Sequence, residues 1–173
     1  MRIAMMDQVP EQINVADVVE DPPVVENVDN NDNNNNYVVD YSKYLGVLEI
    51  PKIGLKRGFY GTDSRYNSIE YNVTMVNGSS LPDVDGGNLI LTAHSGDAWI
   101  SYFAYLWRLD IGDSAFVTYN GRQYQYNIVN IYNVEKSGVL VIHRNEAVNT
   151  LTMITCTKDN DHSQTVYIAE LVG

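Results

Sequence analysis

The chain has 173 residues, is 45% hydrophobic and carries a formal net charge of −11. This length favours one domain with a packed core, and the acidic charge argues against nucleic-acid partners, which require a basic patch. The single cysteine, Cys156, excludes an intrachain disulfide, and the three histidines, His94, His143 and His162, lack the spacing of zinc ligands. No EF-hand-like spacing is present either. We therefore expect no metal site and no required cofactor.

The first 43 residues differ in composition from the rest. They hold nine Asp or Glu against two Lys or Arg, a balance of −7, whereas residues 44–173 hold thirteen against nine, a balance of −4. The Asn- and Asp-rich run 29–36 cannot bury enough apolar surface to offset the entropy of ordering. We expect residues 1–43 to be a largely disordered acidic linker or stalk and residues 44–173 to be the folded domain.

The N-terminal residues contain no recognisable membrane or export signal. No apolar stretch reaches the roughly twenty residues that a membrane helix needs. Met1–Met6 has one charge and a very short apolar run, unlike a secretory signal.

The pattern after residue 44 is mostly that of strands. Apolar, β-branched runs predict strands at 88–94, 115–118, 123–129, 131–134 and 151–156. Asn120-Gly121, between two of them, is typical of a hairpin turn. The apolar stripe within 98–109 predicts one helix packed on the sheet, although a run this aromatic could also be a ligand platform. The fold class is all-β, and the pattern suits a closed antiparallel barrel.

Two of these strands end in residues that could form a thiol-based active site. Cys156 ends the run that starts at Leu151, and a polar stretch follows at once; His94 ends the run that starts at Asn88. A nucleophile needs fixed geometry and access to its substrate, and a strand end provides both. For either residue alone, a packing role is the simpler interpretation, because free cysteine usually behaves as a small buried hydrophobe.

Five segments in order resemble the sortase family. Residues 45–55 are similar to the family's opening Gly-x-Leu-x-Ile-Pro strand, and 88–96 to the segment with the catalytic histidine. The matches continue with Tyr102-Phe103, Leu106, Leu109 and Gly112-Asp113, with the Thr-Leu-x-Thr-Cys-like run 151–156, and with the closing strand 165–171. The resemblance implies a closed barrel of about eight strands with one or two short helices.

The resemblance also implies the roles of individual residues. Cys156 would attack a carbonyl carbon to form a thioester, and His94 would protonate the leaving amine and deprotonate the incoming one. The family's arginine position holds Gln164, which can donate hydrogen bonds but carries no charge. Either Gln164 acts more weakly, or Arg144 or Lys158 replaces the arginine, or the enzyme is slow.

Further residues are expected to bind substrate. The family's pocket-shaping region corresponds to residues 135–149, whose apolar run could receive a leucine-like side chain or could be a short core element. The expected substrate-binding residues are Ala93, Ser95, Val139, Leu140, Ile142, Thr155 and Thr157.

By resemblance, the chain is a cysteine transpeptidase that cleaves a Leu-Pro-x-Thr-Gly-like sorting signal. The accepting amine would belong to lipid II, a peptidoglycan cross-bridge or a pilin lysine. The expected location is the extracellular face of the cell membrane of a Gram-positive bacterium, with an N-terminal anchor that the sequence does not include.

Three alternatives remain at this point. A cysteine-based L,D-transpeptidase would need a Ser-x-Gly-Cys-like turn, whereas Ile154-Thr155 precedes Cys156. A catalytically weak or retired barrel that only binds peptides or pili is made plausible by Gln164. In the N-terminal region, Asp21-Pro22 could begin a lid like that of pilin-assembling sortases, but Pro23 follows where those lids carry an aromatic residue.

Overall fold

The computed structural model describes residues 2–4, 24–26 and 37–173. The Asn-rich run 29–36 and the Asp21-Pro22 segment lie outside the described residues, so the predicted linker and the lid alternative both remain predictions. Three short strands of the first 43 residues are described, in two antiparallel pairs. β1 (Arg2–Ala4) pairs with β10 (Val139–Val141), and β2 (Val24–Glu26) pairs with β3 (Tyr37–Val39).

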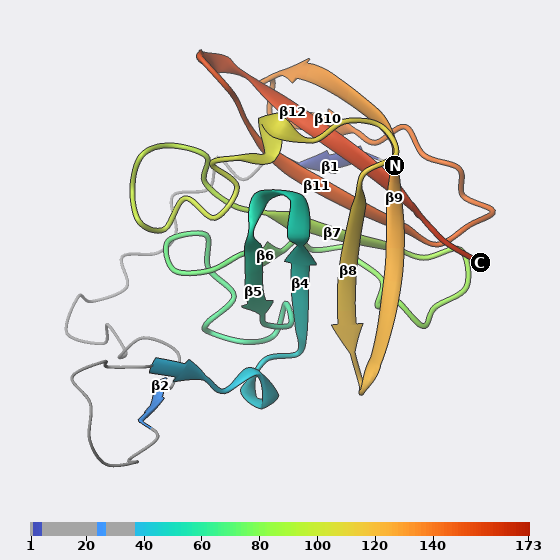
Figure 1. The fold of residues 1–173 in the computed structure, drawn as a ribbon. Helices are drawn as coiled ribbons and strands as arrows, with labels where there is room; N and C mark the ends of the chain where they lie inside the picture. The colour runs from blue at the N-terminus through green and yellow to red at the C-terminus, as the bar shows by residue number, and fades with distance from the viewer. Residues whose placement is uncertain (1, 5–23, 27–36) are drawn as a thin grey trace.

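Eight strands form one curled sheet, in the order β5-β4-β8-β9-β12-β11-β7-β6 (Figure 1). The strands in chain order are β4 (Gly46–Ile50), β5 (Leu55–Phe59), β6 (Thr74–Met75), β7 (Asn88–Thr92), β8 (Ser114–Tyr119), β9 (Arg122–Glu135), β11 (Thr150–Thr157) and β12 (Asn160–Leu171). A single bridge between Phe59 and Val73 joins the two edges, so the barrel is nearly closed. The predicted eight-stranded barrel is confirmed.

One pairing departs from the predicted antiparallel arrangement. β7 and β11 run parallel, with Asn88 opposite Thr150 and Thr92 opposite Ile154. A parallel pair requires a long crossover connection, which residues 93–149 provide. Periodicity predicts that a segment is a strand but not the direction of its neighbour.

The Asn120-Gly121 hairpin forms as predicted. Both residues have positive φ, 48° and 76°, and Tyr119 pairs directly with Arg122. This is the backbone that a two-residue turn of the I′ type requires. The two strands predicted after the turn are one strand, β9.

The barrel has two apolar clusters, one on each face of the sheet. Alternate residues of most strands fill the interior, among them Leu91 and Met153. On the outer face of β7, β11 and β12, a second cluster contains Ile90, Ile154 and Val166. Because successive side chains of a strand alternate between faces, the side chains of β11 point in turn into the barrel, as Met153 does, and to the outer face, as Ile154 does.

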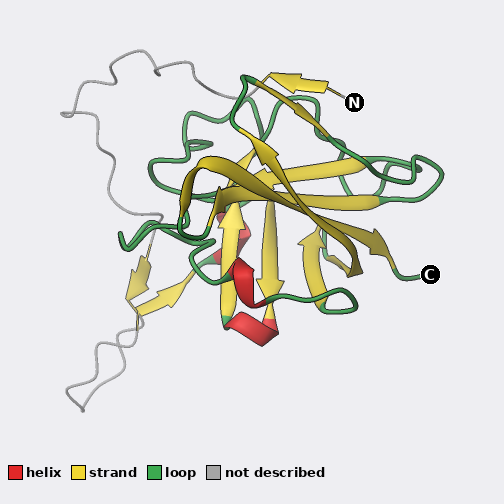
Figure 2. Cartoon of the chain, turned by 90° about the horizontal axis from the view of Figure 1, so that it is seen from above, coloured by secondary structure: helices red, strands yellow, loops and turns green. Residues whose placement is uncertain are grey.

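The helix predicted over 98–109 does not form. Helical turns of the described chain are short 3₁₀ segments, namely η2 (Tyr41–Lys43), η3 (Pro51–Ile53) and η4 (Leu106–Arg108), and Figure 2 shows how little of the fold is helical. The amide of Phe103, which an α-helix would direct to Trp99, donates instead to the carbonyl of His94 at 2.9 Å. Tertiary contact therefore overrides the helical pattern, while Phe103, Leu106 and Leu109 still pack in the barrel core.

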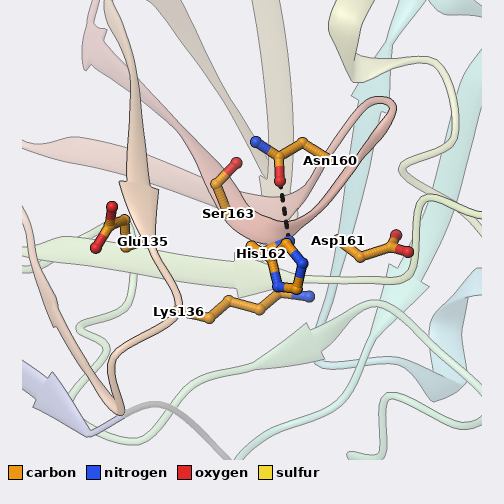
Figure 3. A pocket seen from close by; sticks show the side chains of 6 residues that line it. All are labelled: Glu135, Lys136, Asn160, Asp161, His162 and Ser163. Atoms are coloured by element: carbon orange, nitrogen blue, oxygen red, sulfur yellow. Dashed lines mark hydrogen bonds between the residues drawn. The ribbon is translucent and has the colours of Figure 1, made fainter.

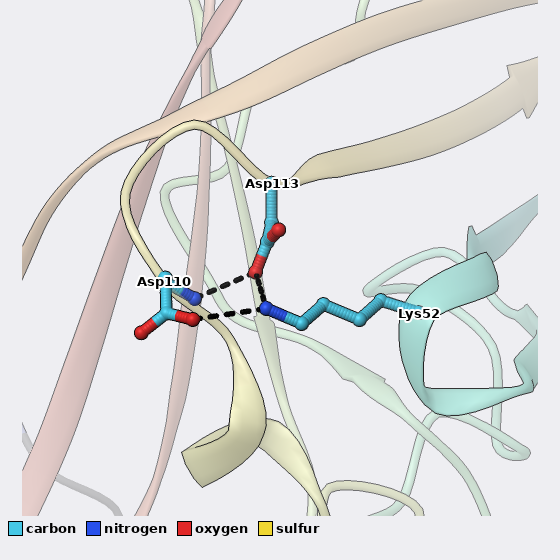
Figure 4. Close-up of polar contacts among 3 residues, drawn as sticks. All are labelled: Lys52, Asp110 and Asp113. Carbon is cyan, nitrogen blue, oxygen red and sulfur yellow. Dashed lines mark hydrogen bonds and ion pairs between the residues drawn. The ribbon is translucent and has the colours of Figure 1, made fainter.

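The far end of the same segment is held by an ion-pair cluster. Lys52, in η3, approaches Asp110 at 2.9 Å and Asp113 at 2.7 Å (Figure 4). The Asp113 carboxylate also accepts from the Asp110 amide at 2.6 Å. The long loop that starts at His94 is thus tied down at the entry to β8.

Candidate active site

The parallel pair places the two predicted catalytic residues at one edge of the sheet. The pairing between β7 and β11 ends with Thr92 and Ile154, and His94 and Cys156 each lie two residues further along their own segment. The carboxyl ends of parallel strands lie at the same edge, so both side chains are delivered there together. Cys156 is half-buried and His94 is 38% exposed.

Hydrogen bonds between the strand ends fix the backbones on both sides of this pair. Each joins a hydroxyl of one segment to a carbonyl of the other: Thr92 Oγ1 to Ile154 O at 2.9 Å, Thr155 Oγ1 to Ala93 O at 2.9 Å, and Ser95 Oγ to Cys156 O at 3.2 Å. Three of the residues predicted to bind substrate therefore join the end of β11 to the segment after β7 and hold the site together: Ala93, Ser95 and Thr155.

Cys156 lies on the outer face of the sheet. It follows Ile154 by two residues, and Ile154 belongs to the outer apolar cluster. The same cluster contains Leu140 and Ile142, which lie in and just after β10 and are 2% and 4% exposed. Val139 is 47% exposed. The structure thus brings the segment expected to bind substrate over the face that carries Cys156.

Tyr132 anchors the β10 segment to β9. Its hydroxyl donates to the carbonyl of Val141 at 3.0 Å and accepts from the amide of His143 at 2.9 Å. Burial raises the pKa of Tyr132, and the His143 amide opposes this to a lesser degree. The phenol therefore stays neutral at ordinary pH and can hold both bonds.

Gln164 is the cross-strand partner of Cys156. Paired residues share a face, so both side chains lie on the outer face of the sheet. The Gln164 amide oxygen is buried and has no hydrogen-bond partner among the described residues. Immediately beyond this pair the register shifts, and Thr157 pairs with Asn160. Irregularities of this kind re-aim side chains next to functional sites.

The two cations considered as replacements for an arginine are both engaged elsewhere. The Lys158 ammonium lies 3.6 Å from the centre of the Trp107 ring. Arg144 donates to Gly86 O at 3.0 Å and to Thr150 Oγ1 at 3.2 Å. Thr150 begins β11, six residues before Cys156, which corresponds to about 20 Å of strand. Arg144 therefore supports the opposite end of β11.

Thr157 is directed away from Cys156. Its hydroxyl forms a 3.0 Å bond with that of Thr165, which in turn donates to Asn133 at 2.9 Å. This chain of bonds ties the end of β11 to β12 and β9.

A polar pocket of about 420 Å³ lies between the end of β9 and the start of β12 (Figure 3). Its lining carries charges of both signs and includes Ser163, whose buried hydroxyl has no partner in the described chain. The lining residues are Glu135, Lys136, Asn160, Asp161, His162 and Ser163. Glu135 and Lys136 lie at the start of the region 135–149 that was expected to shape the substrate pocket, whereas the sequence patterns did not indicate the other four residues.

Another residue that the sequence analysis did not indicate, Glu70, lies beside His94. The Glu70 carboxylate is 3.9 Å from Nε2 of His94. Glu70 belongs to the loop between β5 and β6 and carries no motif, so only the folded chain reveals the pair.

Within 2–4, 24–26 and 37–173, no group of three or more His, Cys, Asp or Glu side chains is placed to hold a metal ion. No helix in this part of the chain is long and apolar enough to span a membrane.

A nearly closed barrel with a cysteine and a histidine at the ends of adjacent parallel strands defines a class of thiol-dependent acyl transferases. A family model described as the Sortase domain matches residues 48–172, and the chain belongs to the sortase family, whose members are cysteine transpeptidases. Among curated proteins, no relative matches.

Solved structures agree with this assignment. The chain is similar to a lid mutant of sortase A from Corynebacterium diphtheriae, with 25% identity, a TM-score of 0.62, and coverage of 75% of this chain and 70% of that one. It is similar to sortase A from the same organism at 25% identity and TM-score 0.63, covering 75% of this chain and spanning 61% of that one. Sortase C1 from Streptococcus agalactiae gives 25% identity, a TM-score of 0.63, and coverage of 79% and 71%.

Proposed function

We propose that the chain is an active transpeptidase that cleaves a C-terminal sorting signal of the Leu-Pro-x-Thr-Gly type through a Cys156 thioester. The observation that carries this proposal is the parallel register of β7 and β11, which delivers His94 and Cys156 to one edge. The proposed acceptors are amines of lipid II, of a peptidoglycan cross-bridge or of a pilin lysine. The proposed location is the extracellular face of the membrane.

The mechanism has two acyl-transfer steps. The Cys156 thiolate attacks the scissile carbonyl carbon and forms a tetrahedral oxyanion. As this collapses, the C–N bond breaks, His94 gives its proton to the leaving amine, and a thioester remains. An incoming amine then loses a proton to His94 and attacks the thioester, which expels the thiolate. The thioester conserves the energy of the peptide bond, so the new amide needs no other energy source.

Substrate would bind along the outer face of β11. Leu140 and Ile142 pack with Ile154 next to Cys156, and the exposed Val139 lies on the same segment. A leucine-like side chain of the signal would contact the exposed Val139, because Leu140 and Ile142 are themselves buried in a core element. The side chains of Thr155 and Thr157 are engaged in hydrogen bonds within the protein, so these residues would contribute to substrate binding through their backbone, which those bonds hold in place.

The second candidate function is a catalytically weak or retired barrel that binds peptides or pili. Gln164 supports it, because a neutral amide lies opposite Cys156 where the family has an arginine. An oxyanion there would lack a charge-assisted donor, and the loss of one donor can cost roughly a hundredfold or more in rate.

Intact-protein mass spectrometry separates the two functions. The protein would be incubated with Leu-Pro-x-Thr-Gly-like and Asn-Pro-x-Thr-x-like peptides, with Cys156→Ala alongside and iodoacetamide labelling as a control for an accessible thiol. An acyl adduct on the native protein that is absent from C156A supports the transpeptidase. No adduct with any peptide, from a protein whose Cys156 still alkylates and which binds the peptides, would instead establish the binding module.

A further inference from the structure

The carboxylate of Glu70 faces one particular nitrogen of the His94 ring. Its Oε1 is 3.9 Å from Nε2, with side-chain exposures of 55% for Glu70 and 38% for His94. This distance is longer than a hydrogen bond, but catalytic hydrogen bonds are often long in unliganded sites and tighten when substrate binds. The two groups are therefore in place to close on each other.

The backbone that carries Glu70 is tightly held. It lies in a turn in which the amides of Tyr71 and Asn72 both donate to the carbonyl of Ser68, at 3.1 and 2.9 Å. Asn72 is only 3% exposed, and its side-chain oxygen accepts from Arg57 of β5 at 2.8 Å. The turn is thus anchored to the barrel wall at a residue two positions from Glu70.

The same turn is fastened to the loop that follows His94. The Tyr71 carbonyl accepts from the hydroxyl of Tyr102 at 3.2 Å, and the Arg57 guanidinium lies 4.4 Å from the centre of the Tyr102 ring. The next residue, Phe103, donates its amide to the His94 carbonyl at 2.9 Å. The backbones of Glu70 and His94 are therefore connected by short contacts, which leaves their side chains to set the final distance.

We propose that Glu70 is a positioning residue that holds the His94 ring through Nε2, an inference that rests on the proposed transpeptidase function. The hydrogen bond at one ring nitrogen determines the tautomer and leaves the other nitrogen for chemistry. With Nε2–H directed to Glu70, the proton moves at Nδ1. Protonated His94 gives the Nδ1 proton to the leaving amine as the C–N bond breaks, and neutral His94 later takes a proton from the incoming amine at Nδ1.

The contact suits orientation better than stability. Ion pairs between groups this exposed contribute little to folding. A carboxylate that fixes an imidazole's tautomer, by contrast, can affect turnover strongly, as the Asp of the Ser-His-Asp triad does. Glu70→Gln is therefore expected to change chemistry without changing the melting temperature.

The first test needs no substrate. Imidazole ¹⁵N shifts of ¹⁵N-His-labelled protein would be recorded for native protein and E70Q, with His94→Gln used to assign the His94 signals. The native protein should show the Nε2–H tautomer, and E70Q should show a mixture of tautomers. Identical His94 shifts in the two proteins would overturn the proposal, whatever the peptide activity.

The second test uses turnover of a Leu-Pro-x-Thr-Gly-like peptide with a glycine-peptide acceptor. E70Q should lower kcat by about tenfold and leave KM within twofold of native. This loss is a part of the rate enhancement of about 10²–10⁴ that acid–base catalysis supplies. Glu70→Asp should recover part of kcat. Asp97→Asn is the matched control, an exposed carboxylate three residues from His94, and should stay within twofold. An equal loss in D97N, or a loss confined to KM, would overturn the proposal. If the native protein turns over no peptide, the proposed function fails while the ¹⁵N result still decides the role of Glu70.

Discussion

Cys156 and Gln164 lie directly opposite each other on β11 and β12, and the regular ladder ends with this pair. The position that the sequence resemblance assigns to the family's arginine therefore holds a neutral amide, directly across from the proposed nucleophile on the neighbouring strand. The oxygen of this amide can only accept and has no partner in the described chain, whereas its nitrogen carries the hydrogens that could be donated to an oxyanion. A neutral donor stabilises such a charge less than a guanidinium does.

Gln164→Arg should accelerate formation of the Cys156 thioester by at least about tenfold, because it supplies a charged donor opposite the nucleophile. The rate of adduct formation, followed by intact mass, measures this, and Gln164→Ala should be slower than native. His162→Arg is the control, since it adds the same charge two residues away on β12. An unchanged rate in Q164R would show that the oxyanion is stabilised from another direction.

Arg144→Met should destabilise the protein by about 2 kcal/mol and leave the activity of the folded fraction unchanged. Arg144 donates to Gly86 O and Thr150 Oγ1 at the start of β11, and bonds from a charged donor contribute about 1.5–3 kcal/mol. Urea unfolding and activity per folded molecule measure the two effects. Arg122→Met, in the exposed β8–β9 hairpin, is the control. A fully stable but inactive R144M would instead assign Arg144 to the chemistry.

Lys158→Met should change the thioester rate by less than twofold. Lys158 is close to Cys156 in sequence, but its ammonium lies 3.6 Å from the centre of the Trp107 ring, where a cation–π contact holds it. Loss of this contact should alter the tryptophan fluorescence. A tenfold slower adduct, with native fluorescence, would mean that Lys158 leaves Trp107 to serve the active site.

The barrel and its two strand-end residues could be predicted because their signals are local. Apolar runs predict β7 and β11, Asn120-Gly121 predicts a hairpin, and His94 and Cys156 are found at the ends of the two apolar runs. Each of these features depends on residues that are neighbours in the chain.

The remaining features depend on contacts between distant segments. The helix expected over 98–109 is lost because the Phe103 amide bonds to His94, a contact that no helical periodicity contains. Glu70 lies 3.9 Å from His94 in a turn whose next two residues are bonded to Arg57 and Tyr102. Such relationships arise from packing, so a single sequence does not reveal them.

The Lys52 cluster gives a pH-dependent prediction for Asp113→Asn. The pKa of Asp113 is lowered first by the hydrogen bond from the Asp110 amide and then by the bond from Lys52, against a smaller opposing effect of burial. A carboxyl whose folded pKa is below its unfolded value of about 3.9 stabilises the fold above that pH, and this contribution is lost as pH falls through the folded pKa. At pH 7, D113N should therefore melt roughly 2 °C below native, since exposed pairs contribute modestly.

Melting curves from pH 7 down to about pH 2 measure this effect. The difference between D113N and native protein should shrink below about pH 4 and disappear once Asp113 is protonated. Asp110→Asn is the matched control: its carboxylate contacts the same lysine but is 82% exposed, so its effect should be smaller. Because Lys52 keeps its charge throughout this range, it does not contribute to the change. A difference that persists at pH 2 would show that the asparagine amide fails to replace the turn's hydrogen bond, and that the charge of Asp113 is not what holds the loop.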